Sequence, residues 1–347
     1  MNIYKTISIK GSKRKLLDLI LELTDEVDDA ETFYDGFCGS GIVSAHMRKN
    51  GYEVFANDKM PSAALYANVF LKGFDPVKVK VLVETANNLP PVTGWLTKHY
   101  SGDFLRQVRG KQAPQWRPRA FVVKNAKKLD AIFDYAHSLP DSPEKNALLF
   151  SAISAMNKVF NGTNDQKSSL AVWQAKSNKP VVLDVPTLIS GPTGSVESCD
   201  IFDSVNTTAD VVYLDPPYTT GVLYDACYHL NDSVTLWDKP TVDTSYSLPR
   251  PERVCFRKNN KCAGAFYMKD TVRSDFDRLL GKFNCKRIII SYSNAPRNAI
   301  SFSELLLTAQ KHGSVVVYDK QHKICMQPKN MKKQQKNLLE YFFVIDK

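Results

Sequence analysis

Apolar positions along the first part of the chain follow two different periods. Between residues 16 and 23 they recur every three or four positions, which predicts an amphipathic helix. Residues 31–35 and 52–57 are short runs containing aromatic and β-branched residues, and they predict strands. A helical pattern that ends at Lys49 lies between them. A strand, a glycine loop, a helix and a second strand in this order predict the start of a parallel sheet.

The same alternation returns towards the C-terminus. Helical patterns cover residues 270–283 and 301–311. A short strand ends within residues 198–202, and further apolar runs predict strands at 211–214, 287–292, 314–318 and 340–345.

Residues 70–195 interrupt this pattern. They contain two helical stretches, 129–139 and 143–160, with loops rich in Pro, Asn and Ser. We therefore predict an α/β fold in three parts: residues 1–69 begin the sheet domain, 70–195 form a mainly helical insert, and 196–347 complete the sheet domain.

Composition narrows the class of protein. Of 347 residues, 43% are hydrophobic and 24% charged, as in a soluble globular protein, and no apolar run reaches the ~18 residues of a membrane span. The first five residues lack the apolar core of a signal peptide, and the seven scattered cysteines contain no CxxC pair. We expect a cytoplasmic protein with reduced thiols, and no metal site.

The net charge of +10 favours a polyanionic partner. One run of cations contains no acid and is interleaved with or follows aromatic residues; its members are Arg106, Arg109, Lys111, Arg117, Arg119, Lys124, Lys127 and Lys128. A second run, within residues 320–337, includes Lys329, Lys332 and Lys333. Such runs form either solvated faces or contacts with phosphate groups, and we interpret the first as part of a DNA-facing insert.

A glycine loop follows the first predicted strand. The strand ends at Asp35, and the loop reads Gly36-Phe37-Cys38-Gly39-Ser40-Gly41. Its spacing differs from the GxGxxG of dinucleotide-binding proteins, and an acid at its mouth would repel a pyrophosphate but attract an ammonium group. Asp58 lies 19 residues beyond Gly39, where an acid commonly accepts hydrogen bonds from ribose hydroxyls. Together these residues favour S-adenosylmethionine as the ligand.

The strand at 211–214 leads into Asp215-Pro216-Pro217-Tyr218. The prolines stop regular structure, Asp215 offers acceptor oxygens, and Tyr218 offers an aromatic face. This combination suits a flat group that carries an NH2. The alternative is a strand end followed by an ordinary proline turn.

With these motifs in this order, the chain resembles the Dam-type adenine-specific DNA methyltransferases, and more closely their restriction-modification relatives. The resemblance covers both ends of the chain and is thin across residues 70–195. The matching stretches are residues 11–13, 35–41, Asp58, 199–202, 213–218, 224–230 and 290–294.

The resemblance implies a class I methyltransferase sheet, mostly parallel with one antiparallel strand near its end, and a helical insert that recognises the target. It also implies S-adenosylmethionine as cofactor, with Ile9 and Lys13 beside its methionine part, Asp35 and the loop at its amino-acid end, Asp58 at its ribose, and Asp200 with Ile201 at its adenine. The expected cofactor-binding residues are Ile9, Lys13, Asp35, Gly36, Phe37, Cys38, Gly39, Ser40, Gly41, Asp58, Asp200, Ile201 and Asp215.

The implied reaction is methylation of the exocyclic amine of an adenine flipped out of double-stranded DNA. The expected catalytic residues are Asp215, Pro216, Pro217 and Tyr218, and the expected DNA-binding residues are Arg106, Arg109, Lys111, Arg117, Arg119, Lys124, Lys329, Lys332 and Lys333. A separate cognate restriction endonuclease is an expected partner. Two departures affect details: Ile9 stands where an aromatic residue is common, and Thr219-Thr220 follows the motif where Asn or Ala-Pro is usual.

Alternative functions remain at this level. Methylation of the exocyclic amine of cytosine in DNA uses the same chemistry and is one alternative. Methylation of adenine in RNA is another. From another class, the chain could be a basic nucleic-acid-binding module with an inactive cofactor site. Methylation of the cytosine ring is set aside, because it requires a cysteine after a proline and the chain contains no Pro-Cys pair.

Overall fold

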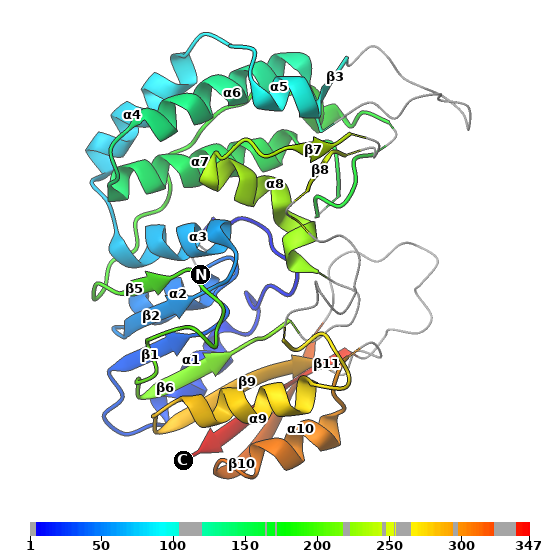
Figure 1. Ribbon diagram of the computed structural model, residues 1–347. Coiled ribbons are helices and arrows are strands. Elements are labelled where there is room, and N and C mark those ends of the chain that lie inside the picture. Colours follow the sequence, from blue (N-terminus) through cyan, green and yellow to red (C-terminus); the bar gives the residue numbers. More distant parts are fainter. Residues whose placement is uncertain are drawn as a thin grey trace.

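The structure is a computed structural model that describes residues 5–103, 120–163, 165–170, 172–217, 223–244, 248–252, 254, 265–293, 298–322 and 338–347. Its frame is a seven-stranded sheet with the strand order β10-β11-β9-β6-β1-β2-β5 (Figure 1). The strands are β1 (Thr32–Asp35), β2 (Glu53–Asn57), β5 (Ser195–Glu197), β6 (Val211–Leu214), β9 (Arg287–Ser293), β10 (Ser314–His322) and β11 (Leu338–Asp346). Two short pairs lie outside the sheet, β3 (Ser101–Gly102) with β4 (Phe121–Val122) and β7 (Val242–Asp243) with β8 (Arg250–Pro251).

Within this sheet the strand β11 runs against all the others. It is antiparallel to both β9 and β10, whereas β1, β2, β5, β6 and β9 pair in parallel. The mostly parallel sheet with one antiparallel strand near the end of the chain is therefore confirmed, and with it the class I methyltransferase fold.

The strand order reverses between β1 and β6. From β1 the chain continues outwards to β2 and β5, and from β6 it continues in the other direction to β9. These two central strands are paired with Asp35 opposite Tyr213, and the amide of Gly36 donates to the carbonyl of Tyr213 at 3.0 Å. Open α/β sheets bind ligands at such a switch point, beyond the carboxyl ends of the strands.

Helices cover both faces of the sheet (Figure 1). The alternation along β6 sends Val211 and Tyr213 towards a core shared with α1 (Leu17–Asp25) and α2 (Ile42–Lys49). Its other residues, Val212 and Leu214, face a second core shared with α9 (Val272–Lys282) and α10 (Phe302–Ala309). Strands that are buried on both faces explain why their sequences are almost continuously apolar.

A helical layer lies beyond the β2–β5 side of the sheet (Figure 1). It consists of α4 (Pro76–Asn88), α5 (Trp95–Tyr100), α6 (Val123–Ser138) and α7 (Pro143–Val159), and it packs on α3 (Pro61–Lys72) and α8 (Tyr224–Leu236). The two helices expected over 129–139 and 143–160 are confirmed as α6 and α7. Their core is continuous with that of the sheet around α3, and α8 comes from the last part of the chain. The divisions at residues 69/70 and 195/196 stay a prediction.

None of the described helices combines the length and the apolar character that a membrane span needs.

Candidate active site

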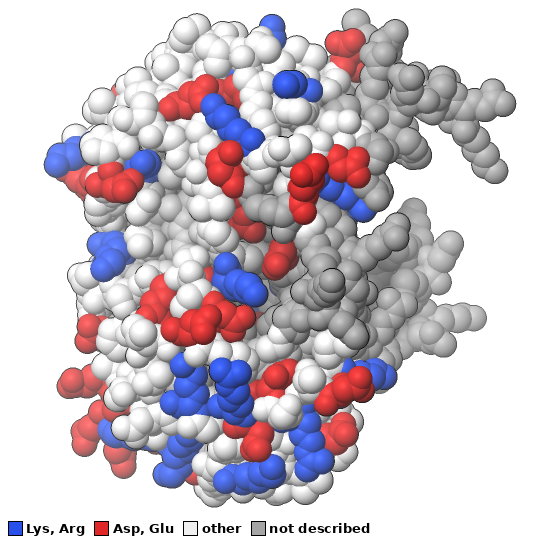
Figure 2. All heavy atoms as spheres, viewed as in Figure 1, with Lys and Arg blue, Asp and Glu red and all other residues white. Residues whose placement is uncertain are grey.

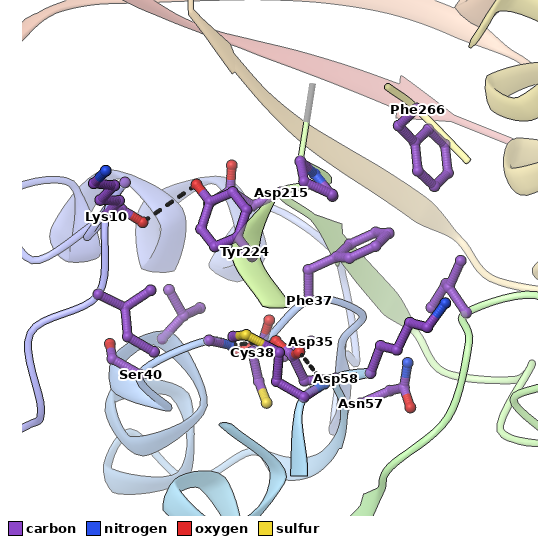
Figure 3. Close-up of a pocket in the computed structure, with 18 of the residues that line it drawn as sticks. Lys10, Asp35, Phe37, Cys38, Ser40, Asn57, Asp58, Asp215, Tyr224 and Phe266 are labelled. Atoms are coloured by element: carbon purple, nitrogen blue, oxygen red, sulfur yellow. Dashed lines mark hydrogen bonds between the residues drawn. The ribbon is translucent and has the colours of Figure 1, made fainter. Parts of the chain in front are cut away.

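A cavity opens at the carboxyl ends of β1 and β6 (Figure 3). Its walls come from the N-terminal segment, the glycine loop, the end of β2, the segment after β5, the end of β6, the start of α8 and residues 265–267. Most of the residues expected from the sequence lie on it: Ile9, Lys13, Asp35, Phe37, Cys38, Gly39, Ser40, Asp58, Asp200, Ile201, Asp215 and Pro217. Gly36, Gly41 and Pro216 are described but do not line it, and Tyr218 is outside the described residues.

The glycines give the loop its shape. A side chain at Gly36 would come within 2.8 Å of the Leu214 side chain, so this glycine lets β1 approach β6 closely. Gly41 begins α2 with a φ of +70°, and a Cβ there would lie 3.1 Å from the backbone of Ala67. These two residues therefore shape the cavity without touching it.

Asp58 ties the glycine loop to the end of β2. Its two carboxylate oxygens accept hydrogen bonds from the amides of Gly39 and Met60, each at 2.9 Å. Burial raises the pKa of Asp58 to about 6, although both hydrogen bonds oppose the rise. The acid expected at a ribose thus also holds the backbone of the loop in place.

Asp35 is a buried acid at the centre of the site. It is 1% exposed, and the Ser44 hydroxyl donates to it at 2.6 Å. Burial raises the pKa of Asp35 to about 7, and the charges of Asp215 and Asp58 add to the rise, whereas the Ser44 hydrogen bond opposes it. A ligand cation beside this carboxyl group would favour its ionised form.

Asp215 lines the same cavity as Asp35, just after the neighbouring strand, and is held by Lys13. The ammonium of Lys13 donates to Asp215 Oδ2 at 2.6 Å and lies 3.3 Å from Glu340 of β11. Burial raises the pKa of Asp215 to about 6; Lys13 opposes the rise and Glu340 adds to it. Glu340 was not expected at the site from the sequence. The signal that could have found it is an acid within an apolar run of β11, two and four residues before the buried Phe342 and Val344 and therefore on their face of the strand.

An aromatic wall closes the side of the cavity towards α9. The rings of Phe37 and Phe266 meet edge to face with centroids 5.8 Å apart, and Ile201 lies on the same cavity (Figure 3). Phe266 has a φ of +72°, a strained conformation for a bulky residue and one that often marks a functional site. No sequence pattern pointed to Phe266. The wall provides apolar faces for a flat ring.

The start of α8 forms the opposite wall. Tyr224 and Asp225 line the cavity, and the Tyr224 hydroxyl donates to the carbonyl of Lys10 at 3.5 Å (Figure 3). The Lys10 amide in turn donates to the Tyr228 hydroxyl at 2.7 Å. Residues 224–230 match the family resemblance, but the sequence predicted no role for them. In the structure they connect α8 to the N-terminal segment at Lys10.

The donor set fits S-adenosylmethionine. Among the described residues, the lining carboxylates Asp35, Asp58, Asp200, Asp215 and Asp225 outnumber the lining ammonium groups Lys10, Lys13 and Lys59. An acidic cavity suits a ligand with an ammonium and a sulfonium, and the aromatic wall suits its adenine. Within the described parts of the chain, no group of His, Cys, Asp and Glu could hold a metal ion.

Of the expected DNA contacts, one lies among the described residues. Lys124 is exposed on the first turn of α6 and does not line the cavity. Arg106, Arg109, Lys111, Arg117, Arg119, Lys329, Lys332 and Lys333 lie outside the described residues. On the face shown in Figure 2, the described Lys and Arg side chains gather mainly over the lower part of the molecule, around α9 and α10, and acids are interspersed among them.

The chain was compared with known families and proteins. The sequence profile described as "D12 class N6 adenine-specific DNA methyltransferase" matches residues 10–246. Type II methyltransferase M.FokI of Planomicrobium okeanokoites is 27% identical over 97% of this chain and 52% of its own length. Modification methylase LlaI of Lactococcus lactis subsp. lactis is 23% identical over 87% of this chain and 48% of its own length.

The chain therefore spans about half the length of these two relatives. A third relative, Type II methyltransferase M.NlaIII of Neisseria lactamica, is 27% identical over 82% of both chains.

Among solved structures, the chain is similar to a magnesium protoporphyrin IX methyltransferase from Synechocystis PCC 6803 with bound SAM, with a TM-score of 0.39 and 7% identity over 100% of this chain and 88% of that one. It is also similar to the rRNA methyltransferase aviRa from Streptomyces viridochromogenes, with a TM-score of 0.35 and 10% identity over 97% and 88% of the two chains.

Proposed function

Since the chain belongs to the D12 class N6 adenine-specific DNA methyltransferases, we propose that it transfers a methyl group from S-adenosylmethionine to the exocyclic amine of adenine in DNA. The observation that carries this proposal is the meeting of two motifs in one cavity. The glycine loop after β1 supplies a place for the methyl donor, and Asp215 after β6 supplies acceptor oxygens for the amine.

In this proposal the cavity holds the cofactor along its length. When bound, S-adenosylmethionine supplies an electrophilic methyl group on its sulfonium. Asp35 and the loop from Gly36 to Gly41 hold the amino-acid end, with Ile9 and Lys13 beside the methionine part. Asp58 accepts from the ribose, and Asp200 with Ile201 and the Phe37 ring receives the adenine.

Asp215 prepares the acceptor. Its carboxylate and the carbonyl of Pro216 would accept hydrogen bonds from the two hydrogens of the adenine amine, which frees the nitrogen lone pair to form the new N–C bond. The bond from sulfur to the methyl group would break with its electron pair left on a neutral thioether, and the methylated amine would lose one proton to solvent. The adenine must leave the duplex to reach this position, at a cost of a few kcal/mol, and stacking on Tyr218 returns ~1–3 kcal/mol. The contribution of the site is alignment and stabilisation of charge as it moves from sulfur to nitrogen.

We place recognition of the target sequence in residues 70–195, with 1–69 and 196–347 as the two parts of the catalytic domain. Arg106, Arg109, Lys111, Arg117, Arg119, Lys124, Lys329, Lys332 and Lys333 contact DNA phosphates in this proposal. The relatives named as type II methyltransferases support a role in restriction-modification, with a cognate endonuclease that acts separately.

Transfer of tritium from methyl-labelled S-adenosylmethionine to DNA, followed by nucleoside analysis, tests the proposal. We expect N6-methyladenine with the wild-type protein and a loss of at least about 100-fold with Asp215→Ala, because a preorganised acceptor is removed. DNA binding should remain. The matched control is Asp277→Ala on α9, because among the described residues Asp277 pairs with Lys311 and His312 at the surface, away from the cavity. Methyl transfer to cytosine or to RNA alone, or full turnover in Asp215→Ala, would contradict the proposal.

A further inference from the structure

An acid–ammonium–acid cluster, in which Lys13 and Glu340 are buried and Asp215 is half-buried, lies at the acceptor motif. Lys13 is 6% exposed and Glu340 is 5% exposed. The Lys13 ammonium contacts Asp215 at 2.6 Å and Glu340 at 3.3 Å, and it also donates to the carbonyl of Gly11 at 3.1 Å. One cation therefore bridges an acid at the end of β6 and an acid near the start of β11.

The sheet register builds this cluster. Glu340 pairs opposite Ser293 of β9, and β9 pairs with β6, whose end carries Asp215. The hydroxyl of Ser291, two residues earlier on β9, donates to Glu340 Oε1 at 2.6 Å, the same oxygen that faces Lys13. Ser291 of β9 thus anchors the Glu340 oxygen that contacts the Lys13 ammonium.

Such a cluster is costly for stability alone. Removing carboxylates and an ammonium from water costs several kcal/mol per ion, and an apolar replacement of similar volume is often neutral or stabilising. The geometry instead suits control of Asp215. Lys13 donates to Oδ2 of this carboxylate, which sets its orientation. Within the described parts of the chain no hydrogen bond occupies Oδ1, so this oxygen can accept an amine hydrogen. Because Glu340 shares the ammonium, the cluster keeps a net negative charge.

We propose that Glu340 is a positioning residue for methyl transfer: it holds the Lys13 ammonium in the place from which Lys13 orients the Asp215 carboxylate towards the amine. This inference rests on the proposed function and extends it to a strand at the far end of the chain.

The charged and titratable groups around Asp215 determine whether its pKa rises or falls in a variant. They are Lys13 from the N-terminal segment, Glu340 from β11, Asp35 from β1, Tyr213 from β6 and Tyr224 from α8. Glu340→Gln keeps an oxygen that can accept from Ser291 and Lys13 but removes one negative charge. Since the charge of Glu340 raises the pKa of Asp215, its removal should lower that pKa. Asp346→Asn is the matched control, because Asp346 lies on the same face of β11 at its other end and pairs with Arg287.

The first measurement does not depend on turnover. The pKa of Asp215 is followed by 13C NMR of labelled aspartate side chains, with Asp215→Asn identifying the signal. We expect the wild-type pKa of about 6 to fall in Glu340→Gln and to stay unchanged in Asp346→Asn.

The second measurement is single-turnover methyl transfer. We expect Glu340→Ala to lose about 10- to 100-fold in rate, the range in which misplaced reacting groups act, with cofactor and DNA dissociation constants within about threefold of wild type. Glu340→Gln should recover most of the rate and move the acid limb of the pH–rate profile to lower pH. Asp346→Ala should lower the melting temperature without this loss of rate.

The outcomes separate the two proposals. An Asp215 titration that is the same in Glu340→Gln and wild type, or a full rate in Glu340→Ala, overturns the role of Glu340 and leaves adenine methylation intact. A wild-type protein that binds the cofactor but methylates no adenine, together with the shifted Asp215 titration, overturns the proposed function and retains the coupling of Glu340 to Asp215.

Discussion

At the scale of single residues, the site is defined by three carboxyl groups that the fold removes wholly or partly from water. Burial is the main cause that raises the pKa values of Asp35, Asp58 and Asp215 to about 7, 6 and 6. Acids with raised pKa values suit the binding of a cation, because a positive charge on the ligand stabilises the ionised carboxylate that burial disfavours.

We predict that S-adenosylmethionine binds more tightly as the pH rises through about 7, the pKa of Asp35. Binding of the ligand cation requires the ionised carboxylate, so protons are released on binding below this pH. Calorimetry in buffers of different ionisation enthalpy measures both effects. In Asp35→Asn the affinity for S-adenosylmethionine should fall, and its change with pH near 7 should disappear. Equal pH profiles of affinity for the two proteins would contradict a role of Asp35 in binding the ligand cation.

The raised pKa of Asp35 also predicts how the stability of the ligand-free protein depends on pH. Because the folded-state pKa of Asp35 lies above its unfolded value of 3.8, the native state holds the proton more tightly between these values. The contribution of Asp35 to stability is therefore present at low pH and is lost as the pH rises towards about 7. We expect Asp35→Asn to raise the melting temperature of the ligand-free protein at pH 8 but not at pH 4. A lower melting temperature at both pH values would refute this.

At the scale of secondary-structure elements, one wall of the cavity depends on a break in a helix. Helix α8 is interrupted at Tyr228, whose φ and ψ are −130° and 18°. The side-chain oxygen of Gln166 accepts from the backbone amides of Leu230 and Asn231 at 3.0 and 3.1 Å, and the backbone amide of Gln166 donates to the carbonyl of Cys227 at 2.6 Å. A loop of the helical layer thus supplies the partners that the broken helix lacks, and it holds the half of α8 that carries Tyr224.

We predict that Gln166→Leu destabilises the protein by about 1–3 kcal/mol, because two buried amides lose their acceptor. Urea unfolding measures the loss, and cofactor affinity should fall with it because the wall at Tyr224 loosens. Gln310→Leu, at the exposed end of α10, is the control. Unchanged stability in Gln166→Leu would show that the break in α8 needs no cap.

At the scale of the whole molecule, the switch point between β1 and β6 brings the two halves of the site together, and the helical layer rises beside it (Figure 1). Cations are concentrated in the sequence around residues 106–128 and 320–337. The described lining of the cavity, in contrast, holds more carboxylates than ammonium groups.

We predict that Arg117→Ala combined with Arg119→Ala weakens DNA binding and flattens its salt dependence. Loss of two phosphate contacts should reduce the slope of log K against log salt by about 1.8. Fluorescence anisotropy with duplex DNA between 50 and 200 mM salt measures the slope. The control is Lys78→Ala with Lys80→Ala, two exposed cations of α4. An identical slope in both double variants would show that Arg117 and Arg119 do not contact DNA phosphates.

Much of the site could be predicted because its motifs are local. Residues 35–41 and 213–217 carry their roles in consecutive positions, and the cavity contains most of them. Phe266 and Glu340 could not be predicted in the same way, because each is a single residue in an unremarkable stretch and reaches the cavity only through the packing of distant elements.

The sequence by itself determined the class of elements, the glycine loop with its acids and the acceptor motif, because hydrophobic period, glycine conformation and proline chemistry act over a few neighbouring residues. Only the tertiary structure decided that β1 lies beside β6, that Glu340 reaches Lys13, that Gln166 caps the break in α8, and that Asp35 and Asp215 are buried enough to hold protons near neutral pH. Strand order, burial and the fields of distant charges arise from contacts between residues far apart in the chain, which no local pattern specifies.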